Sequence, residues 1–349
     1  MKNLLFLIFR LFIFSNLGLA VYALPLKVVT TLPDYAVIAR MIGGDRVKVS
    51  SIVRGDQDAH FIRPKPSFAN LVREAEVLID TGLDLETWLP TVVDTSGNRH
   101  VRSGEPGYVS ASYGMHFLDK PEKLSRSEGG LHIYGNPHVT CSPVLMRVAA
   151  QNIANGLIKN DPEGREVYTQ NLKAFLQEMD IRLFGQKLVD LLGGERLCAL
   201  AEEGKLIPFL QREQYKNTPL IRFLGGWMEK MSPLYGASLV TYHKNWIYFF
   251  KLFGLHEAGT IEPRPGIPPS AKHVVDLITL MREKNIRIIF AANYFSKREI
   301  SDIAEKVGAE PVIIPMYVEG IPEATDYFTL VDIWVNGLVE AGKKTGMIS

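Results

Sequence analysis

The feature that most constrains the fold of this chain is a long helical pattern near its middle, over residues 162–192. Pro162 stands where a helix would begin, since proline is favoured in the first turn. Apolar residues then recur at helical steps, at Leu172, Phe175, Leu176, Met179, Leu183 and Leu188. This spacing predicts a helix with one buried face. At 1.5 Å per residue it would be on the order of 40 Å long, more than the width of one lobe, so we expect it to connect two lobes.

Short apolar runs alternate with helical patterns on both sides of this helix. Before it, strands are predicted over residues 27–31, 47–53 and 77–80, and helices over residues 34–43, 67–73, 83–93 and 143–157. After it, strands are predicted over residues 237–241, 258–261, 286–291 and 312–314, and helices over residues 243–253, 270–284, 297–307 and 328–341. Strands that alternate with helices indicate parallel sheets with helices on both faces.

The predicted fold is therefore α/β, with two lobes that are each a mainly parallel sheet flanked by helices. We expect an N-terminal lobe over residues 24–161, a long linking helix over residues 162–192 and a C-terminal lobe over residues 193–349. Weak helical patterns over residues 193–226 suggest no function of their own.

The first 23 residues have the pattern of a secretory signal peptide. Lys2 and Arg10 precede an apolar run, and Val21 and Ala23 are small enough for the −3 and −1 positions of a cleavage site. An uncleaved anchor is the alternative, but the apolar run is short for a span of about 20 residues. No cysteine stands at the cleavage point, so a lipid anchor is not indicated. We expect a periplasmic protein that is secreted through a cleaved signal peptide.

Composition narrows the range of partners. The chain is 46% hydrophobic and 22% charged, as in ordinary globular proteins. Its formal net charge of +1 provides no basic excess to neutralise phosphates, which argues against a nucleic-acid partner. Cys141 and Cys198 could form a disulfide in an oxidising compartment or remain buried thiols, and their separation in sequence does not decide between the two.

Three histidines stand where a polar loop or a strand gives way to a turn or a helix, namely His60, His138 and His243. Ligands of open α/β sheets bind beyond the carboxyl ends of the strands. Neutral imidazole is a common zinc ligand, and three imidazoles with one further ligand make a tetrahedral site. The chain has no H-E-x-x-H or C-x-x-C motif. A metal site must therefore be assembled from distant segments, and these three residues predict one between the lobes.

The remaining histidines need no metal to explain them. Structural or surface roles suffice for His100, His116, His256 and His273. His132 lies six residues before His138 in the same loop, so we expect it near the site, beside the ligands.

The segments around the three histidines carry a family resemblance. Asp58-Ala59-His60, followed by PKPS over residues 64–67, resembles the first metal motif of the zinc- and manganese-binding solute-binding proteins of ABC importers. Gly135-Asn136-Pro137-His138 resembles their second motif, and residues 240–249 around His243 resemble their third. The similarity extends over about residues 28–338 and is poorest over residues 193–226.

The resemblance implies a monomer that captures a divalent metal between two lobes, with limited lobe motion, and delivers it to a membrane permease. It implies no enzymatic activity. Many members add an Asp or Glu ligand after the strand that corresponds to residues 286–291, where this chain has Ser296. The fourth position is then open to water or to another carboxylate, and Glu262 is the best candidate because it follows a strand. The expected ligands are His60, His138, His243 and Glu262.

An imidazole-rich site favours Zn²⁺, with Mn²⁺ less expected because manganese suits oxygen ligands. Each ligating imidazole needs an acceptor on its other nitrogen, a role for which Asp58 and Glu262 are candidates. Three histidines with an open fourth position are also the arrangement of a catalytic zinc, so a zinc hydrolase or hydratase is an alternative. A periplasmic metal chaperone without a permease is another.

Overall fold

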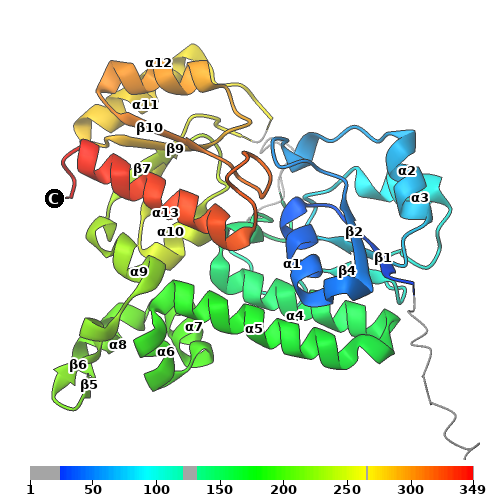
Figure 1. The fold of residues 1–349 in the computed structure, drawn as a ribbon. Helices are drawn as coiled ribbons and strands as arrows, with labels where there is room; N and C mark the ends of the chain where they lie inside the picture. Colours follow the sequence, from blue (N-terminus) through cyan, green and yellow to red (C-terminus); the bar gives the residue numbers. More distant parts are fainter. Residues whose placement is uncertain (1–23, 121–131, 265, 349) are drawn as a thin grey trace, which may run out of the picture.

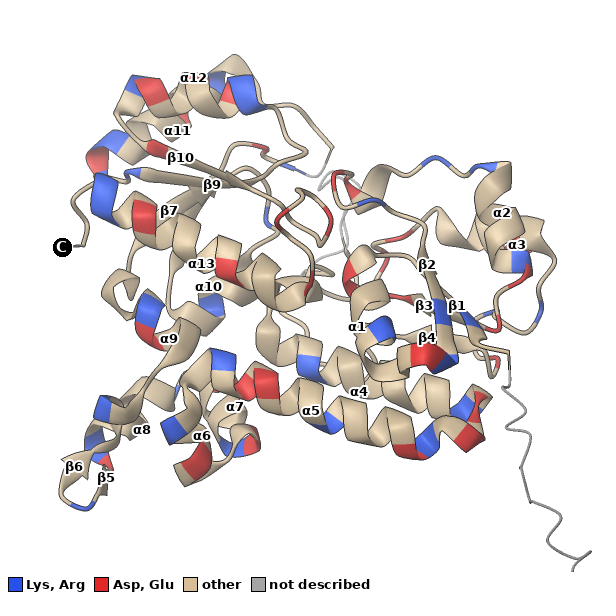
Figure 2. Cartoon of the chain, in the orientation of Figure 1, with Lys and Arg blue, Asp and Glu red and all other residues tan. Residues whose placement is uncertain are grey.

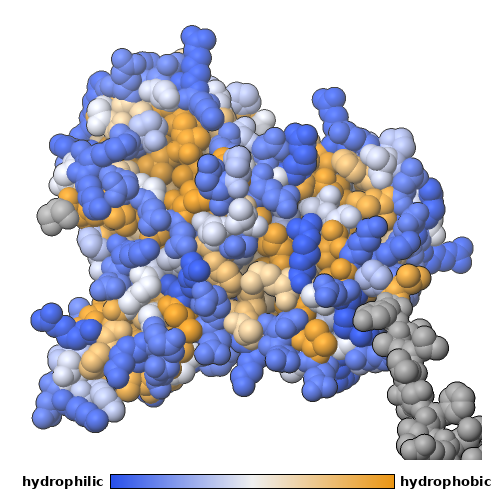
Figure 3. Space-filling model, viewed as in Figure 1, coloured by the Kyte–Doolittle hydropathy of each residue, from blue (hydrophilic) through white to orange (hydrophobic). Residues whose placement is uncertain are grey.

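The computed structural model describes residues 24–120, 132–264 and 266–348 (Figure 1). The expected signal peptide, residues 1–23, lies outside the described residues. Among the helices that are described, none is both long and apolar enough to cross a bilayer. Basic and acidic residues are interspersed over both lobes (Figure 2), and hydrophilic residues cover most of the face in Figure 3.

The N-terminal lobe contains a four-stranded parallel sheet in the order β2-β1-β3-β4. Its strands are β1 (Leu26–Thr30), β2 (Val47–Ser51), β3 (Val77–Asp80) and β4 (Tyr108–Ser110). Its helices are α1 (Pro33–Gly43), α2 (Pro66–Arg73), α3 (Leu89–Ser96) and α4 (Pro143–Asn160). α1 packs on α4 and α2 packs on α3, with the strands between the two pairs (Figure 1). Every residue of β3 is buried, as expected for a strand covered on both faces.

The C-terminal lobe repeats this plan with a parallel sheet in the order β10-β9-β7-β8. Its strands are β7 (Ser238–Thr241), β8 (His256–Thr260), β9 (Ile288–Ala292) and β10 (Glu310–Ile314). Its helices are α10 (Ile247–Phe253), α11 (Ala271–Glu283), α12 (Lys297–Val307) and α13 (Tyr327–Lys344). α11 packs on α12 along one side of the sheet, and α13 packs on β9 and β10 (Figure 1). The predicted α/β fold of two flanked parallel sheets is confirmed.

The connecting helix is present but shorter than predicted. A 3-10 turn (Pro162–Gly164) leads into α5 (Arg165–Phe184), and a separate helix α6 (Gln186–Leu192) follows. The prediction of one helix through residue 192 is wrong at Gly185, whose φ of 83° ends α5. A Cβ there would lie only 2.8 Å from Cα of Gly225, so the close backbone approach requires glycine. With 20 residues, α5 is about 30 Å long.

Polar side-chain contacts attach α5 to both lobes. Near its start, the hydroxyl of Tyr168 on α5 donates to Asp161 Oδ2 at 2.5 Å, and Arg46 Nε lies 2.7 Å from the same oxygen. Near its end, Arg182 Nη1 lies 2.7 Å from Oδ2 of Asp332 on α13, and Trp227 Nε1 donates to Oδ1 of the same carboxylate at 2.8 Å. α5 is therefore a strut with a polar attachment at each end.

A small, mainly helical region follows α6 and lies below the C-terminal sheet in Figure 1. Its elements are α7 (Gly194–Glu202), α8 (Leu206–Arg212), the short antiparallel strands β5 (Gln214–Tyr215) and β6 (Thr218–Pro219), and α9 (Gly226–Met231). α9 packs on α5 and α13, so this region supports the connecting helix.

Both cysteines are free and buried, which decides between the two alternatives left by the sequence. Cys141 Sγ lies 3.8 Å from Met316 Sδ, and Cys198 Sγ lies 3.7 Å from Asp180 Oδ1. Each thiol thus packs in a different part of the core.

Two helices begin later than predicted, and the second shift bears on the site. α3 begins at Leu89 because Leu83 and Asp84 adopt positive φ values of 61° and 60°. α10 begins at Ile247, so His243 lies in the turn between β7 and α10, where Asn245 N donates to His243 O at 2.8 Å. His243 is therefore presented by a loop at the carboxyl end of a strand.

Candidate metal centre

The structure brings the three predicted histidines together from three loops. His60 lies in a 3-10 turn (Ala59–Phe61), His138 directly precedes another (Val139–Cys141), and His243 follows β7. One ring nitrogen from each lies within 4.8 Å of the other two. The ring centroids are 5.0 Å apart for His60 and His138, 5.4 Å for His138 and His243, and 5.8 Å for His60 and His243. Two of these loops precede α5 and one follows it, so both lobes contribute.

Each of the three imidazoles has a hydrogen-bond partner at Nδ1. The acceptors are Asp58 Oδ1 for His60 at 2.7 Å, Asn136 Oδ1 for His138 at 2.8 Å and Glu262 Oε2 for His243 at 2.7 Å. When Nδ1 carries the hydrogen and donates it to the acceptor, the lone pair is on Nε2. This tautomer can bind a metal through Nε2. Nε2 of His138 is buried and has no hydrogen-bond partner among the described residues. The arrangement therefore presents Nε2 atoms to a common centre, as metal binding requires.

Asn136 is the supporting residue that sequence reasoning missed. Its Oδ1 also accepts from the backbone N–H of His138 at 3.0 Å, and its Nδ2 donates to Lys244 O at 2.8 Å. Since Lys244 follows His243, one buried amide links loops of the two lobes at the site. An asparagine side chain that bonds the backbone two residues later is a known turn geometry, so the Asn-Pro-His order was a usable signal.

Two aromatic side chains donate hydrogen bonds to backbone carbonyls in the loops that carry His138 and His60. Tyr248 OH donates to Asn136 O at 2.6 Å, and Trp88 Nε1 donates to Ala59 O at 2.8 Å. The hydroxyl of Tyr248 also accepts from Leu118 N at 3.2 Å. The backbones next to His60 and His138 are thus fixed by buried hydrogen bonds.

The surroundings keep the inner imidazoles neutral. Burial, followed by the charges of His60 and His243, lowers the pKa of His138 well below its usual value. The same causes lower the pKa of His132 to about 3. Neutral imidazole is the form that binds metals, so these residues need not lose a proton at neutral pH.

Glu262 and Ser296, the residues considered for the fourth position, make other contacts. Glu262 Oε2 is at Nδ1 of His243, and its Oε1 accepts from Gly266 N at 2.7 Å. Ser296 caps α12, where its Oγ accepts from Glu299 N at 3.3 Å. Within the described part of the chain, the ligand atoms that lie within 4.8 Å of one another come from the three imidazoles, and neither Glu262 nor Ser296 is among them.

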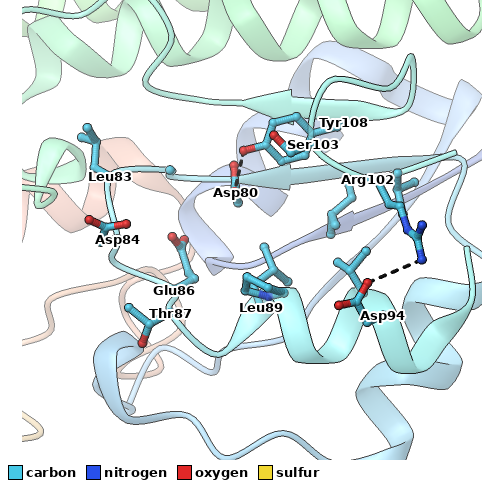
Figure 4. Close-up of a pocket in the computed structure, with 15 residues that line it drawn as sticks. Asp80, Leu83, Asp84, Glu86, Thr87, Leu89, Asp94, Arg102, Ser103 and Tyr108 are labelled. Atoms are coloured by element: carbon cyan, nitrogen blue, oxygen red, sulfur yellow. Dashed lines mark hydrogen bonds and ion pairs between the residues drawn. The ribbon is translucent and has the colours of Figure 1, made fainter. Parts of the chain in front are cut away.

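A separate cavity of about 460 Å³ lies beside α3 in the N-terminal lobe (Figure 4), and none of the three histidines lines it. Tyr108 OH donates to Asp80 Oδ2 at 3.0 Å, and Thr31 Oγ1 donates to Glu86 Oε1 at 2.6 Å. Burial, followed by the charge of Glu86, raises the pKa of Asp80 well above its usual value, and burial raises that of Glu86. These carboxyl groups are part of the lobe's interior and not of the histidine cluster.

Comparison with known proteins identifies the family. The model of the family described as zinc-uptake complex component A, periplasmic, matches residues 28–181 and 225–341. The chain belongs to this family. The unmatched residues 182–224 include α7 and α8, which lie in the stretch 193–226 where the resemblance in sequence is poorest.

Individual relatives agree on transport and differ in the metal. The high-affinity zinc uptake system protein ZnuA of Bacillus subtilis is 23% identical over 293 residues, covering 83% of this chain and 77% of its own. The manganese ABC transporter substrate-binding lipoprotein PsaA of Streptococcus pneumoniae is 22% identical over 316 residues, covering 88% and 85%. A crystal structure of ZnuA has the same fold, with a TM-score of 0.67 and 23% identity over 91% of this chain and 99% of that one.

Family membership makes this chain a substrate-binding component of a metal ABC importer. Such components bind divalent metals and are not enzymes, so the hydrolase alternative is not retained. Zinc and manganese are both represented among the relatives.

Proposed function

We propose that this protein captures zinc in the periplasm, as a monomer freed from its signal peptide, and delivers it to the permease of an ABC importer. The observation that carries this proposal is the convergence of three imidazoles whose Nδ1 atoms are all occupied by acceptors. Such a site offers nitrogen donors with fixed orientation.

The donor set favours zinc over manganese. Imidazole suits zinc, whereas manganese suits carboxylate and water oxygens. The nearest carboxylates, Asp58 and Glu262, each hydrogen-bond to an imidazole, so they support nitrogen ligands from behind. We assign Glu262 this positioning role toward His243.

Capture follows from where the loops originate. His60 and His138 belong to the lobe before α5, and His243 belongs to the lobe after it. A metal held by all three connects the lobes directly, in addition to the link that Asn136 already makes. Release to the permease would require these loops to separate.

Calorimetric titration at pH 7.5 with zinc and, separately, with manganese tests the proposal. We expect one zinc per protein with much tighter binding than manganese. His60→Ala, His138→Ala and His243→Ala should each weaken zinc binding strongly. His256→Ala, at an exposed position outside the cluster, is the matched control and should bind like the wild type. Equal or tighter binding of manganese would refute the choice of metal.

Delivery needs its own measurement. The wild-type protein should restore zinc uptake in cells that lack their own zinc-binding importer component, and the three histidine variants should not. Zinc binding in vitro without restored uptake would favour a buffer or chaperone over an importer component.

A further inference from the structure

A fourth histidine, His132, lies against the cluster. Its Nε2 is 3.2 Å from Nε2 of His60, and its ring centroid is 5.2 Å from that of His60 and 6.0 Å from that of His138. His132 is half-buried, whereas the neighbouring Ile133 and Tyr134 are exposed. We propose that His132 is the fourth ligand of the captured metal, which would make the centre an all-imidazole site.

The separation of the two nitrogens fits a shared metal. Two nitrogens that are each 2.0–2.1 Å from a tetrahedral zinc lie about 3.3–3.4 Å apart. The 3.2 Å between His132 and His60 is close to this value before any metal enters. A small movement of one ring would thus complete a pair of ligands.

The hydrogen bonds define the metal-free state of this pair. In the neutral, metal-binding form of His60 that donates its Nδ1–H to Asp58, Nε2 is an acceptor. The N–H in the 3.2 Å contact must then belong to His132 Nε2. When a metal binds, this hydrogen bond breaks, and the proton moves to Nδ1 of His132 by exchange with solvent. The bond thus keeps the fourth imidazole close to the site until the metal replaces it.

The backbone explains why His132 lies here. Gly135 N donates to His132 O at 3.1 Å, which forms a turn between His132 and the motif that carries His138. Gly135 has a φ of 118°, and a Cβ at this position would lie 2.7 Å from Phe117 Cβ. Only glycine fits this turn, and the turn brings both imidazoles to the same side of the site.

The carboxylates next to the cluster already accept hydrogen bonds from the imidazoles and their loops. Both oxygens of Glu262 have partners, and Asp58 Oδ1 accepts from Nδ1 and the backbone N of His60. His132, by contrast, offers a nearby ring nitrogen whose hydrogen-bond partner is His60, itself one of the proposed ligands. An all-imidazole centre would further disfavour manganese, which suits oxygen ligands.

X-ray absorption at the zinc edge of the zinc-loaded full chain tests this inference, which rests on the proposed capture of zinc by the other three histidines. We expect four nitrogen ligands with the scattering pattern of four imidazoles. In His132→Gln the count should fall to three imidazoles with one oxygen, and zinc affinity should fall by about tenfold or more. His256→Gln is the matched control and should leave both results unchanged.

The outcomes separate the two proposals. A wild-type spectrum with three imidazoles and one oxygen would overturn the role of His132 while leaving zinc capture intact. A wild-type protein that binds no zinc would instead overturn the proposed function. Because the wild-type spectrum decides the question alone, a folding defect in His132→Gln would not prevent the test.

Discussion

Replacement of Asn136 by alanine tests how the site is assembled. The change removes three hydrogen bonds, to Nδ1 and the backbone N of His138 and to Lys244 O. At a net 0.5–1.5 kcal/mol each, their loss should lower the free energy of unfolding by about 1.5–4.5 kcal/mol. Loss of the acceptor that orients His138 should also weaken zinc binding by about 10–100-fold, which corresponds to about 1.4–2.8 kcal/mol.

Competition titration against a zinc chelator at pH 7.5 gives the affinity, and urea unfolding of the metal-free protein gives the stability. Asn136→Asp separates the two roles, because a carboxylate still accepts from His138 but cannot donate to Lys244 O. We expect it to keep most of the zinc affinity and to lose stability. Asn152→Ala is the matched control, since Asn152 Nδ2 donates to Ala111 O and Tyr113 O outside the site. A zinc affinity of Asn136→Ala equal to that of the wild type would refute the orienting role of Asn136.

Three further predictions concern charge. Zinc affinity should fall only modestly between pH 7.5 and pH 5.5, because protons compete for ordinary imidazole below about pH 6 while the lowered pKa of His138 keeps that ligand neutral in this range; a calorimetric loss of affinity as large as that of His138→Ala would contradict this. Glu262→Gln should weaken zinc binding by about tenfold without changing the ligands seen by X-ray absorption, whereas loss of an oxygen ligand would make Glu262 the fourth ligand. Asp80→Asn should raise the melting temperature relative to the wild type more at pH 8 than at pH 4. The pKa of Asp80 is raised in the folded protein, so the wild type loses stability as pH rises above the pKa of the unfolded chain, and the variant lacks this loss. A difference in melting temperature that is independent of pH would count against this.

Local patterns predicted the sheets and three of the clustered side chains. The strands were found because short apolar runs alternate with helical periods, and His60, His138 and His243 were found because each stands at a loop in a recognisable motif. Gly185 was missed because the apolar period continues through Leu188, while the break depends on contact with Gly225, 40 positions further along the chain. Tertiary contacts of this kind leave little trace in a local pattern.

The supporting residues were only partly predictable for the same reason. Asp58 was expected behind the ligands, and Glu262 was expected either there or as the fourth ligand; both accept from an imidazole Nδ1. Asn136 was overlooked because an amide is a less obvious partner than a carboxylate. The contact between His132 and His60 depends on the backbone turn at Gly135, so sequence reasoning could place His132 near the site but could not orient it.

The strut α5 has a consequence for the kinetics of metal exchange. Its ends are held by Tyr168–Asp161 in one lobe and by Arg182–Asp332 in the other, whereas the clustered histidines lie in loops and short turns. A wide hinge motion would have to break buried packing along α5, but displacement of a loop would not. Metal residence time should therefore respond more to changes in loop backbones, such as that at Gly135, than to changes in the strut, so a permease could unload the protein by engaging its loops alone.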